Sequence, residues 1–201
     1  MLILSSNHLT LKKIKSYQLN TRKNTNSIFI GTSLDGYITD KNGGLEWLNM
    51  IPNPDHDDMG YTAFTEQIDA LVMGRTTFEM VCSFDIDWPY KKPVFVLSNS
   101  INEVPEKYKD KVFLAKGILT EILNAIHKKG LYKLYIDGGV TIQNFLKEDL
   151  IDNLIITRIP VLLGGGSQLF SVLPKALEFE QVETKVYLNE LMQAHYRRKR
   201  G

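Results

Sequence analysis

LVMGRTTFEM at residues 71–80 and LYIDGGVTIQNF at residues 134–145 decide the fold of this chain. In each stretch a short apolar run leads into glycine, and apolar residues at helical spacing follow the glycine. This order predicts a buried strand, a tight turn and a helix, and the chain contains it twice. Strands that alternate with helices in this way are typical of an α/β domain with a largely parallel sheet.

The rest of the chain continues the alternation. Residues 40–57 are rich in Gly, Pro, Asn and Asp and are predicted to form a long loop, a type of segment that is often functional. Residues 178–187 and 191–198 alternate around Leu188-Asn189-Glu190, which predicts an antiparallel hairpin on the sheet edge. Further strands are expected at residues 27–34, 93–98, 111–115 and 153–163, and further helices at residues 117–129 and from Asp55 or Asp57 through Ile68.

The composition suits one globular domain. The chain of 201 residues is long enough to bury a core. Its 43% apolar and 23% charged residues are ordinary for a globular protein. Residues 1–26 carry five basic side chains and no acidic one, and we interpret them as a poorly ordered basic extension of a domain at residues 27–201. A transit peptide has a similar composition and is the alternative. The single cysteine, Cys82, cannot form an internal disulfide, which is consistent with a cytoplasmic location.

The distribution of charge argues against two classes of partner. Nine of the 24 basic residues lie at residues 1–26 and 197–200, which leaves 15 basic against 23 acidic residues in the body. A nucleic-acid-binding protein would carry its positive charge on a folded face, so no nucleic acid is expected as a partner. No apolar run has the length of a transmembrane helix, so we expect no membrane insertion either.

Asp55-His56-Asp57-Asp58 has the residue types of a metal site. The other histidines, His8, His127 and His195, have no spacing that resembles a zinc site. Acidic residues that cap and begin a helix account for the cluster better, because they satisfy free N–H groups and favour the helix dipole. We therefore expect no metal site.

The first strand–helix junction has the composition of a phosphate site. Free N–H groups and the helix dipole both point outward at such a junction. Gly74 lets a ligand approach the backbone, Arg75 offers a bidentate cation, and Thr76 can cap the helix and donate its hydroxyl. An ordinary helix cap with a surface arginine explains the motif equally well when it is taken alone.

Two further strand ends carry related residues. Gly138-Gly139 lies between strand and helix, where bare backbone could pass beneath a pyrophosphate, although a plain turn has the same composition. Ser98 and Asn99 follow a third strand. Three such edges in one α/β chain indicate one extended dinucleotide site better than three chance turns.

The ordered motifs resemble those of the dihydrofolate-reductase-like proteins. The closest likeness is to the bacterial branch shared with the reductase domain of bifunctional riboflavin-biosynthesis deaminase-reductases, and it covers about residues 27–198. The resemblance implies a three-layer α/β/α fold with a central, mixed, mostly parallel sheet and a C-terminal antiparallel hairpin. It also implies NADPH as hydride donor, a pterin- or pyrimidine-like heterocyclic substrate and a homodimer. The segments that carry it lie at residues 27–39, 45–48, 70–79, 94–100, 134–146 and 150–170.

The same resemblance assigns twelve residues to NADPH. It places Arg75 and Thr76, which follow Gly74 in the same motif, at the adenosine end and its 2′-phosphate, and it places Ser98 and Asn99 along the same end. The pyrophosphate would contact Gly138, Gly139, Val140 and Thr141, with Gln143 nearby, and the nicotinamide and substrate cleft would be lined by Ile30 and Gly31.

Two residues of the predicted loop and helix start are candidates for the chemistry. Trp47 matches the tryptophan of a mobile active-site loop, and core packing is the alternative role for it. In dihydrofolate reductases protonation depends on a carboxylate on the helix before the Gly-Arg motif, and Asp58 lies 17 residues before Arg75, a compatible spacing. Asp57 and Glu66 are alternatives. A partly buried carboxylate at this place would have a raised pKa and serve as a proton source or relay.

Asp35 is the competing acid. It matches a residue that lies near the substrate in the riboflavin-type motif, whereas composition favours a turn residue before Gly36. We therefore predict an NADPH-dependent reductase of a pterin- or pyrimidine-like heterocycle. The rivals are a riboflavin-pathway reductase acting on a ribosylaminopyrimidine phosphate and a non-catalytic nucleotide-binding protein on the same fold.

Overall fold

The central strands of the sheet are short and almost wholly buried. β2 (Ala70–Gly74), β3 (Val94–Leu97) and β5 (Lys133–Asp137) are apolar along nearly their whole length. Helices cover both faces of such a strand, so its side chains need not alternate between apolar and polar. The computed structural model, which describes residues 24–84 and 86–200, confirms all three predicted strands.

Eight strands form one sheet in the order β4-β3-β2-β5-β1-β6-β8-β7. Every neighbouring pair from β4 to β6 is parallel, whereas β8 runs antiparallel to β6 and β7 antiparallel to β8. The predicted mixed sheet with a C-terminal edge hairpin is therefore confirmed. The remaining strands are β1 (Thr25–Thr32), β4 (Val112–Ala115), β6 (Asn153–Arg158), β7 (Phe179–Tyr187) and β8 (Leu191–Arg198).

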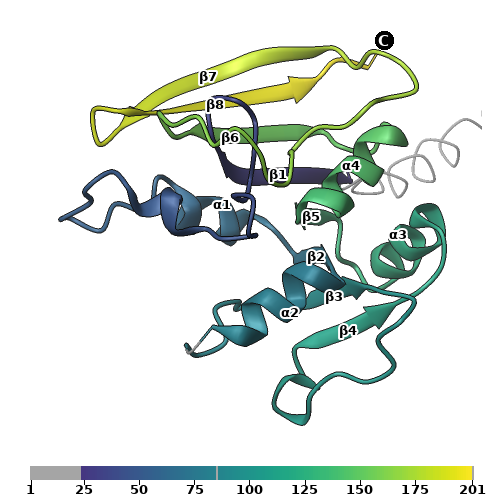
Figure 1. The fold of residues 1–201 in the computed structure, drawn as a ribbon. Coiled ribbons are helices and arrows are strands. Elements are labelled where there is room, and N and C mark those ends of the chain that lie inside the picture. The colour runs from purple at the N-terminus through teal and green to yellow at the C-terminus, as the bar shows by residue number, and fades with distance from the viewer. Residues whose placement is uncertain (1–23, 85, 201) are drawn as a thin grey trace, which may run out of the picture.

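A hydrophobic core lies on each face of the sheet, between the strands and the helices that cover them. Alternate residues of β2 divide between the two cores: Leu71 and Met73 pack on the side of α1 (Tyr61–Gln67) and α2 (Arg75–Ser83). Ala70 and Val72 pack on the side of α3 (Leu119–Lys128) and α4 (Gly139–Lys147). Figure 1 shows the sheet between the two helix pairs, so the three-layer α/β/α fold is confirmed.

The first strand begins two residues before Ser27, near which the folded part was predicted to start. β1 begins at Thr25, because Asn26 is buried and its backbone N–H donates to the Asp152 carboxylate at 2.7 Å. The Asn26 side chain also donates to the Leu150 carbonyl at 2.7 Å. Residues 1–23, most of the predicted extension, lie outside the described residues.

Two other elements differ from their predictions. The strand predicted at 153–163 ends at Arg158, because Pro160 has no N–H for the sheet ladder. The helix expected from Asp55 or Asp57 begins at Tyr61, and the loop predicted at 40–57 contains the short 3₁₀ helix η1 (Glu46–Asn49). A second 3₁₀ helix, η2 (Glu106–Tyr108), precedes β4.

Candidate functional site

A cavity of about 790 Å³ opens at the carboxyl ends of the central strands. Residues of β1, the ends of β2 and β5, the amino ends of α2 and α4, and the η1 segment line it. Ligands of open parallel sheets bind at this edge, because the strand ends and the helix amino termini converge there. The fold therefore offers one large site at the place where its class carries function.

The predicted cofactor residues gather at this edge. Ten of them line the cavity, namely Ile30, Gly31, Gly74, Arg75, Thr76, Gly138, Gly139, Val140, Thr141 and Gln143. Ser98 and Asn99 instead line a second pocket of about 370 Å³. Leu97, Leu119 and Asn144 line both, so the smaller pocket continues the larger one. The Ser98 hydroxyl accepts hydrogen bonds from the N–H groups of Ser100 and Ile101, at 3.1 and 3.0 Å.

The amino ends of α2 and α4 form a cradle. Their strands are neighbours, with Met73 of β2 paired to Asp137 of β5. A Cβ atom on Gly74 would lie 2.8 Å from Thr141 Oγ1, and one on Gly138 would overlap Thr77 Oγ1. Gly138 also has a φ of 88°, a conformation that glycine adopts without strain. Glycine at both positions lets the two helices approach this closely.

The cradle has the donors that a phosphate needs. Among the residues that the structure describes, no side chain caps either helix, so the first N–H groups of α2 and α4 are available to a ligand. Arg75, the first residue of α2, pairs with Glu79 at 3.5 Å, and both side chains are about half exposed. An exposed pair of this kind is weak, so the guanidinium can turn to an anion. These residues fit the phosphates of NADPH.

Asp137, which the sequence-based prediction missed, is the carboxylate of the cavity. It is the last residue of β5 and lies directly before the cradle glycine. Desolvation raises the pKa of its carboxyl to about 6, although the hydrogen bond from the Gly138 N–H at 2.8 Å and the contact with the Tyr135 side chain oppose the shift. A carboxyl with this pKa holds or releases a proton near neutral pH.

An aromatic cluster supplies the low-dielectric surroundings of Asp137. Tyr135 is buried, and its ring lies 5.1 Å from Phe64 and 6.4 Å from Tyr61. The Tyr135 hydroxyl donates to the Phe29 carbonyl at 2.9 Å. The cluster therefore favours the neutral form of Asp137.

The pKa predicted for Asp58 is wrong in direction. A hydrogen bond with the Thr62 side chain is the main cause of its lowered pKa. Its carboxylate also accepts hydrogen bonds from the N–H groups of Thr62 and Gly60, each at 2.8 Å, and these bonds lower the pKa further. It is exposed and is not among the residues that line the cavity. Asp58 therefore caps α1, and the geometry does not support its predicted part in protonation. Asp57 and Glu66, the alternatives, are also exposed and outside the cavity lining.

Asp35 also has a structural role. Its carboxylate accepts hydrogen bonds from the Ser33 hydroxyl at 2.6 Å and from the N–H groups of Leu163 and Gly164 at 3.1 and 2.8 Å. The bond from Ser33 is the main cause of its lowered pKa. Asp35 therefore joins the turn after β1 to the loop after β6, and it is not a lining residue of the cavity.

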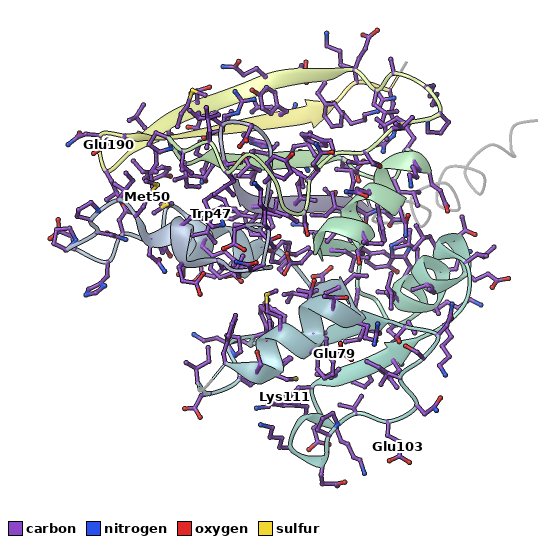
Figure 2. The ribbon with its side chains drawn as sticks, in the orientation of Figure 1. Trp47, Met50, Glu79, Glu103, Lys111 and Glu190 are labelled. Carbon is purple, nitrogen blue, oxygen red and sulfur yellow. The ribbon has the colours of Figure 1, made fainter. Side chains whose placement is uncertain are left out.

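Trp47 lies in η1, and the neighbouring Leu45 and Leu48 line the cavity in its place. Figure 2 shows Trp47 in the body of the molecule beside the α1 segment, away from Glu190 at the hairpin turn. Its indole N–H is buried without a partner among the described residues. Trp47 is half-buried and belongs to neither hydrophobic core, so its role stays a prediction. Leu48 reaches the cavity because Gly31 leaves room for it, since a Cβ there would lie 2.8 Å from Leu48 Cδ2.

Residues 24–84 and 86–200 also bear on metal binding and on membrane insertion. No cluster of three or more His, Cys, Asp and Glu side chains in these ranges could hold a metal ion. In the same ranges no helix has the length and apolar character needed to cross a membrane.

Comparison with known proteins places the chain in a family. Residues 27–192 match the model of the RibD C-terminal domain. The Bacillus subtilis (strain 168) protein YwjB is 34% identical over 173 residues, which are 84% of this chain and 95% of that protein. A candidate riboflavin biosynthesis protein of Shewanella sp. PV-4 is 58% identical, with a TM-score of 0.86 over 88% of this chain and 99% of that one.

A more distant structure shares the fold alone. Dihydrofolate reductase from Enterococcus faecalis, complexed with NADP(H) and RAB-propyl, is 20% identical and superimposes with a TM-score of 0.61 over 88% of this chain and 97% of that one. The predicted likeness to dihydrofolate-reductase-like proteins is thus confirmed. The family model, which spans most of the sheet, and the relatives that align over nearly their whole length lead to one assignment: the chain belongs to the RibD C-terminal domain family.

Proposed function

We propose that this protein is an NADPH-dependent reductase of a pyrimidine- or pterin-like heterocycle. One observation carries the proposal: a single cavity joins an anion-binding cradle with a cation, at Gly74-Arg75 and Gly138, to a protonatable carboxyl at Asp137. Reduction of a C=N or C=O bond by a hydride donor needs both parts, because the cofactor must be held and the reduced group must receive a proton.

The cradle is the part that holds NADPH. The free N–H groups of α2 and α4 bind the pyrophosphate, and Arg75 pairs with the 2′-phosphate. Ser98 and Asn99 extend the site into the adjoining pocket at the adenosine end. When bound, NADPH supplies the hydride. The NADP(H) complex of Enterococcus faecalis dihydrofolate reductase supports a site of this kind on the same fold.

The carboxyl of Asp137 is the proton source. At a pKa of about 6 it is partly protonated near neutral pH, and transfer from such an acid is efficient when its pKa lies near the working pH. Apolar side chains of Leu45, Leu48 and Phe84 line the same cavity and exclude water from the reacting group. These residues hold the proton and keep the site dry.

Membership in the RibD C-terminal domain family favours a pyrimidine over a pterin as substrate. The departure of the chain from the folate-type pattern points the same way, because Trp47 is followed by Leu48-Asn49-Met50-Ile51-Pro52 without an acid. The predicted homodimer and cytoplasmic location remain predictions.

The test is NADPH oxidation with a ribosylaminopyrimidine phosphate and with dihydrofolate as alternative substrates. We expect turnover of the pyrimidine to exceed that of dihydrofolate and to be lost in Asp137→Asn. NADPH binding without turnover of either compound would favour the non-catalytic rival. Failure of the chain to bind NADPH at all would contradict the proposal.

A further inference from the structure

A second polar group reaches the cavity from a segment that the cofactor does not use. Tyr90 lies between α2 and β3, and it lines the same cavity as Asp137. The side chain is partly buried. Since neither the cradle nor the predicted cofactor contacts include this segment, Tyr90 is available to the substrate.

Trp88 fixes the position of Tyr90. The two rings lie 5.3 Å apart in an edge-to-face arrangement. Trp88 in turn packs against Tyr108 at 4.6 Å and Phe78 at 6.2 Å, and both of these residues belong to the core on the α1 and α2 side. Aromatic contacts of this kind hold a ring in one orientation. Tyr90 is therefore a fixed wall of the cavity.

The hydroxyl of Tyr90 has no partner of its own. Within residues 24–84 and 86–200, no group forms a hydrogen bond with it. Its proton stays on, because burial and then the nearby charge of Asp137 raise the pKa of Tyr90 well above its usual range. A neutral hydroxyl without a partner, set in a ligand cavity, is a hydrogen-bond donor for the ligand.

Tyr61 is the natural comparison. It also lies near Asp137, whose charge contributes to the raised pKa of Tyr61, about 12. Its ring, however, packs against Phe29 at 5.5 Å, and Tyr61 is not among the residues that line the cavity. The two tyrosines therefore share the surroundings of Asp137 but differ in access to a ligand.

We propose that the Tyr90 hydroxyl donates a hydrogen bond to a ring carbonyl oxygen of the substrate while Asp137 faces a ring nitrogen of the same molecule. The substrate class is then a planar heterocycle with an oxo group and a ring nitrogen on neighbouring edges. This inference rests on the proposed function, since it assigns a substrate contact in the same cavity. Tyr90 thereby sets specificity, because analogues without the carbonyl leave its hydroxyl unpaired.

The test uses lumazine, a fluorescent pteridine dione that carries both groups, as a binding probe for the full-length protein saturated with NADP⁺. Tyr90→Phe removes one hydroxyl and keeps the ring. We expect it to weaken lumazine binding about tenfold, the effect of one lost hydrogen bond in an enclosed site. Tyr61→Phe, the matched control, should change the dissociation constant less than about twofold.

The probe and the cofactor are measured separately. Equal weakening by the two substitutions, or no binding of lumazine to the unaltered protein, would overturn the assignment of Tyr90. Melting temperatures of both variants identify any loss that comes from misfolding. NADPH binding and NADPH oxidation test the proposed function on their own. NADPH could fail to bind while lumazine, without added cofactor, binds more weakly to Tyr90→Phe than to Tyr61→Phe. In that case the reductase proposal fails, and the hydrogen bond from Tyr90 to the ligand is still supported.

Discussion

The β2–α2 and β5–α4 junctions have the same design and different chemistry. Both are strand, glycine and helix, and they stand on neighbouring strands with Met73 opposite Asp137. Gly74 has an ordinary extended backbone and is followed by a cation, Arg75. Gly138 has a φ of 88° and is preceded by an acid, Asp137. The first junction is suited to binding an anion, and the second to holding a proton. The side chain next to the glycine therefore gives each junction its chemistry, although the two share one backbone motif.

The largest expected effect lies at the acid of the second junction. Asp137→Asn removes the proton source and keeps the size of the side chain, so kcat for the pyrimidine substrate should fall about 100-fold or more, with NADPH affinity little changed. In the unaltered protein kcat should decline as pH rises through about 6, because the carboxyl loses its proton. The pH profile of kcat in the two proteins checks this, and an unchanged profile in Asp137→Asn would exclude Asp137.

The same residue makes folding depend on pH. The pKa of Asp137 is about 6 in the folded chain against an ordinary 3.8, so its stabilising contribution is complete below 3.8 and is lost as pH rises through 6. Above neutral pH the free energy of unfolding of Asp137→Asn should therefore be higher than that of the unaltered protein by up to about 3 kcal/mol. Near pH 4 the two free energies should be equal. Urea unfolding at several pH values measures the difference, and a constant offset at all pH values would contradict it.

The close approach of the junctions is tested by Gly138→Ala. The new Cβ would overlap Thr77 Oγ1 and occupy a positive φ, so stability should fall by about 2 kcal/mol and NADPH binding by more than tenfold. Gly130→Ala is the matched control, because Gly130 has a φ of 82° but open space around it. We expect it to cost about 1 kcal/mol in chemical unfolding and to leave NADPH binding intact. Equal loss of NADPH affinity in both variants would argue against the cradle.

The cation of the first junction should have a smaller effect. Arg75→Ala is expected to weaken NADPH binding about tenfold and NADH binding less than twofold, since only NADPH carries the 2′-phosphate. Glu79→Gln provides the control, because it frees Arg75 from its ion pair and should not weaken either cofactor. Calorimetric titration measures both affinities. Equal weakening of NADPH and NADH by Arg75→Ala would remove Arg75 from the 2′-phosphate.

The smallest effect is expected at Asp58, the helix cap that the sequence made a candidate for protonation. Asp58→Asn should change kcat less than twofold, because Asp58 does not line the cavity. It should cost roughly 0.5 kcal/mol of stability, since asparagine caps a helix nearly as well as aspartate. A loss of kcat comparable to that of Asp137→Asn would return Asp58 to the chemistry.

The fold and the cradle could be predicted because their signals are local. Apolar runs such as 70–73 and 94–97 define strands, and glycine at a strand–helix junction marks a close approach of backbone. The start of α1 could not be placed in this way. Asn53 exchanges two hydrogen bonds with the Asp57 backbone, each at 2.9 Å, and His56 and Met59 have positive φ values, so side-chain turns compete with the helix there.

Asp137, the proposed proton donor, escaped prediction because its environment is not local. The pKa of Asp137 depends on burial, and the groups near it include Tyr135 of its own strand and Tyr61 of α1, which lies far away in the sequence. Spacing to the Gly-Arg motif pointed instead to Asp58, whose hydrogen bonds lower its pKa. An acid placed directly before Gly138, at the carboxyl end of a buried strand, was the available signal.

The most direct test is a crystal structure of the protein with NADPH bound. The pyrophosphate should lie between the amino ends of α2 and α4, with the nicotinamide in the part of the cavity that Asp137 and Tyr90 line. A nicotinamide whose reactive C4 faces Asp58 or Asp35, or a pyrophosphate away from Gly74 and Gly138, would contradict the account.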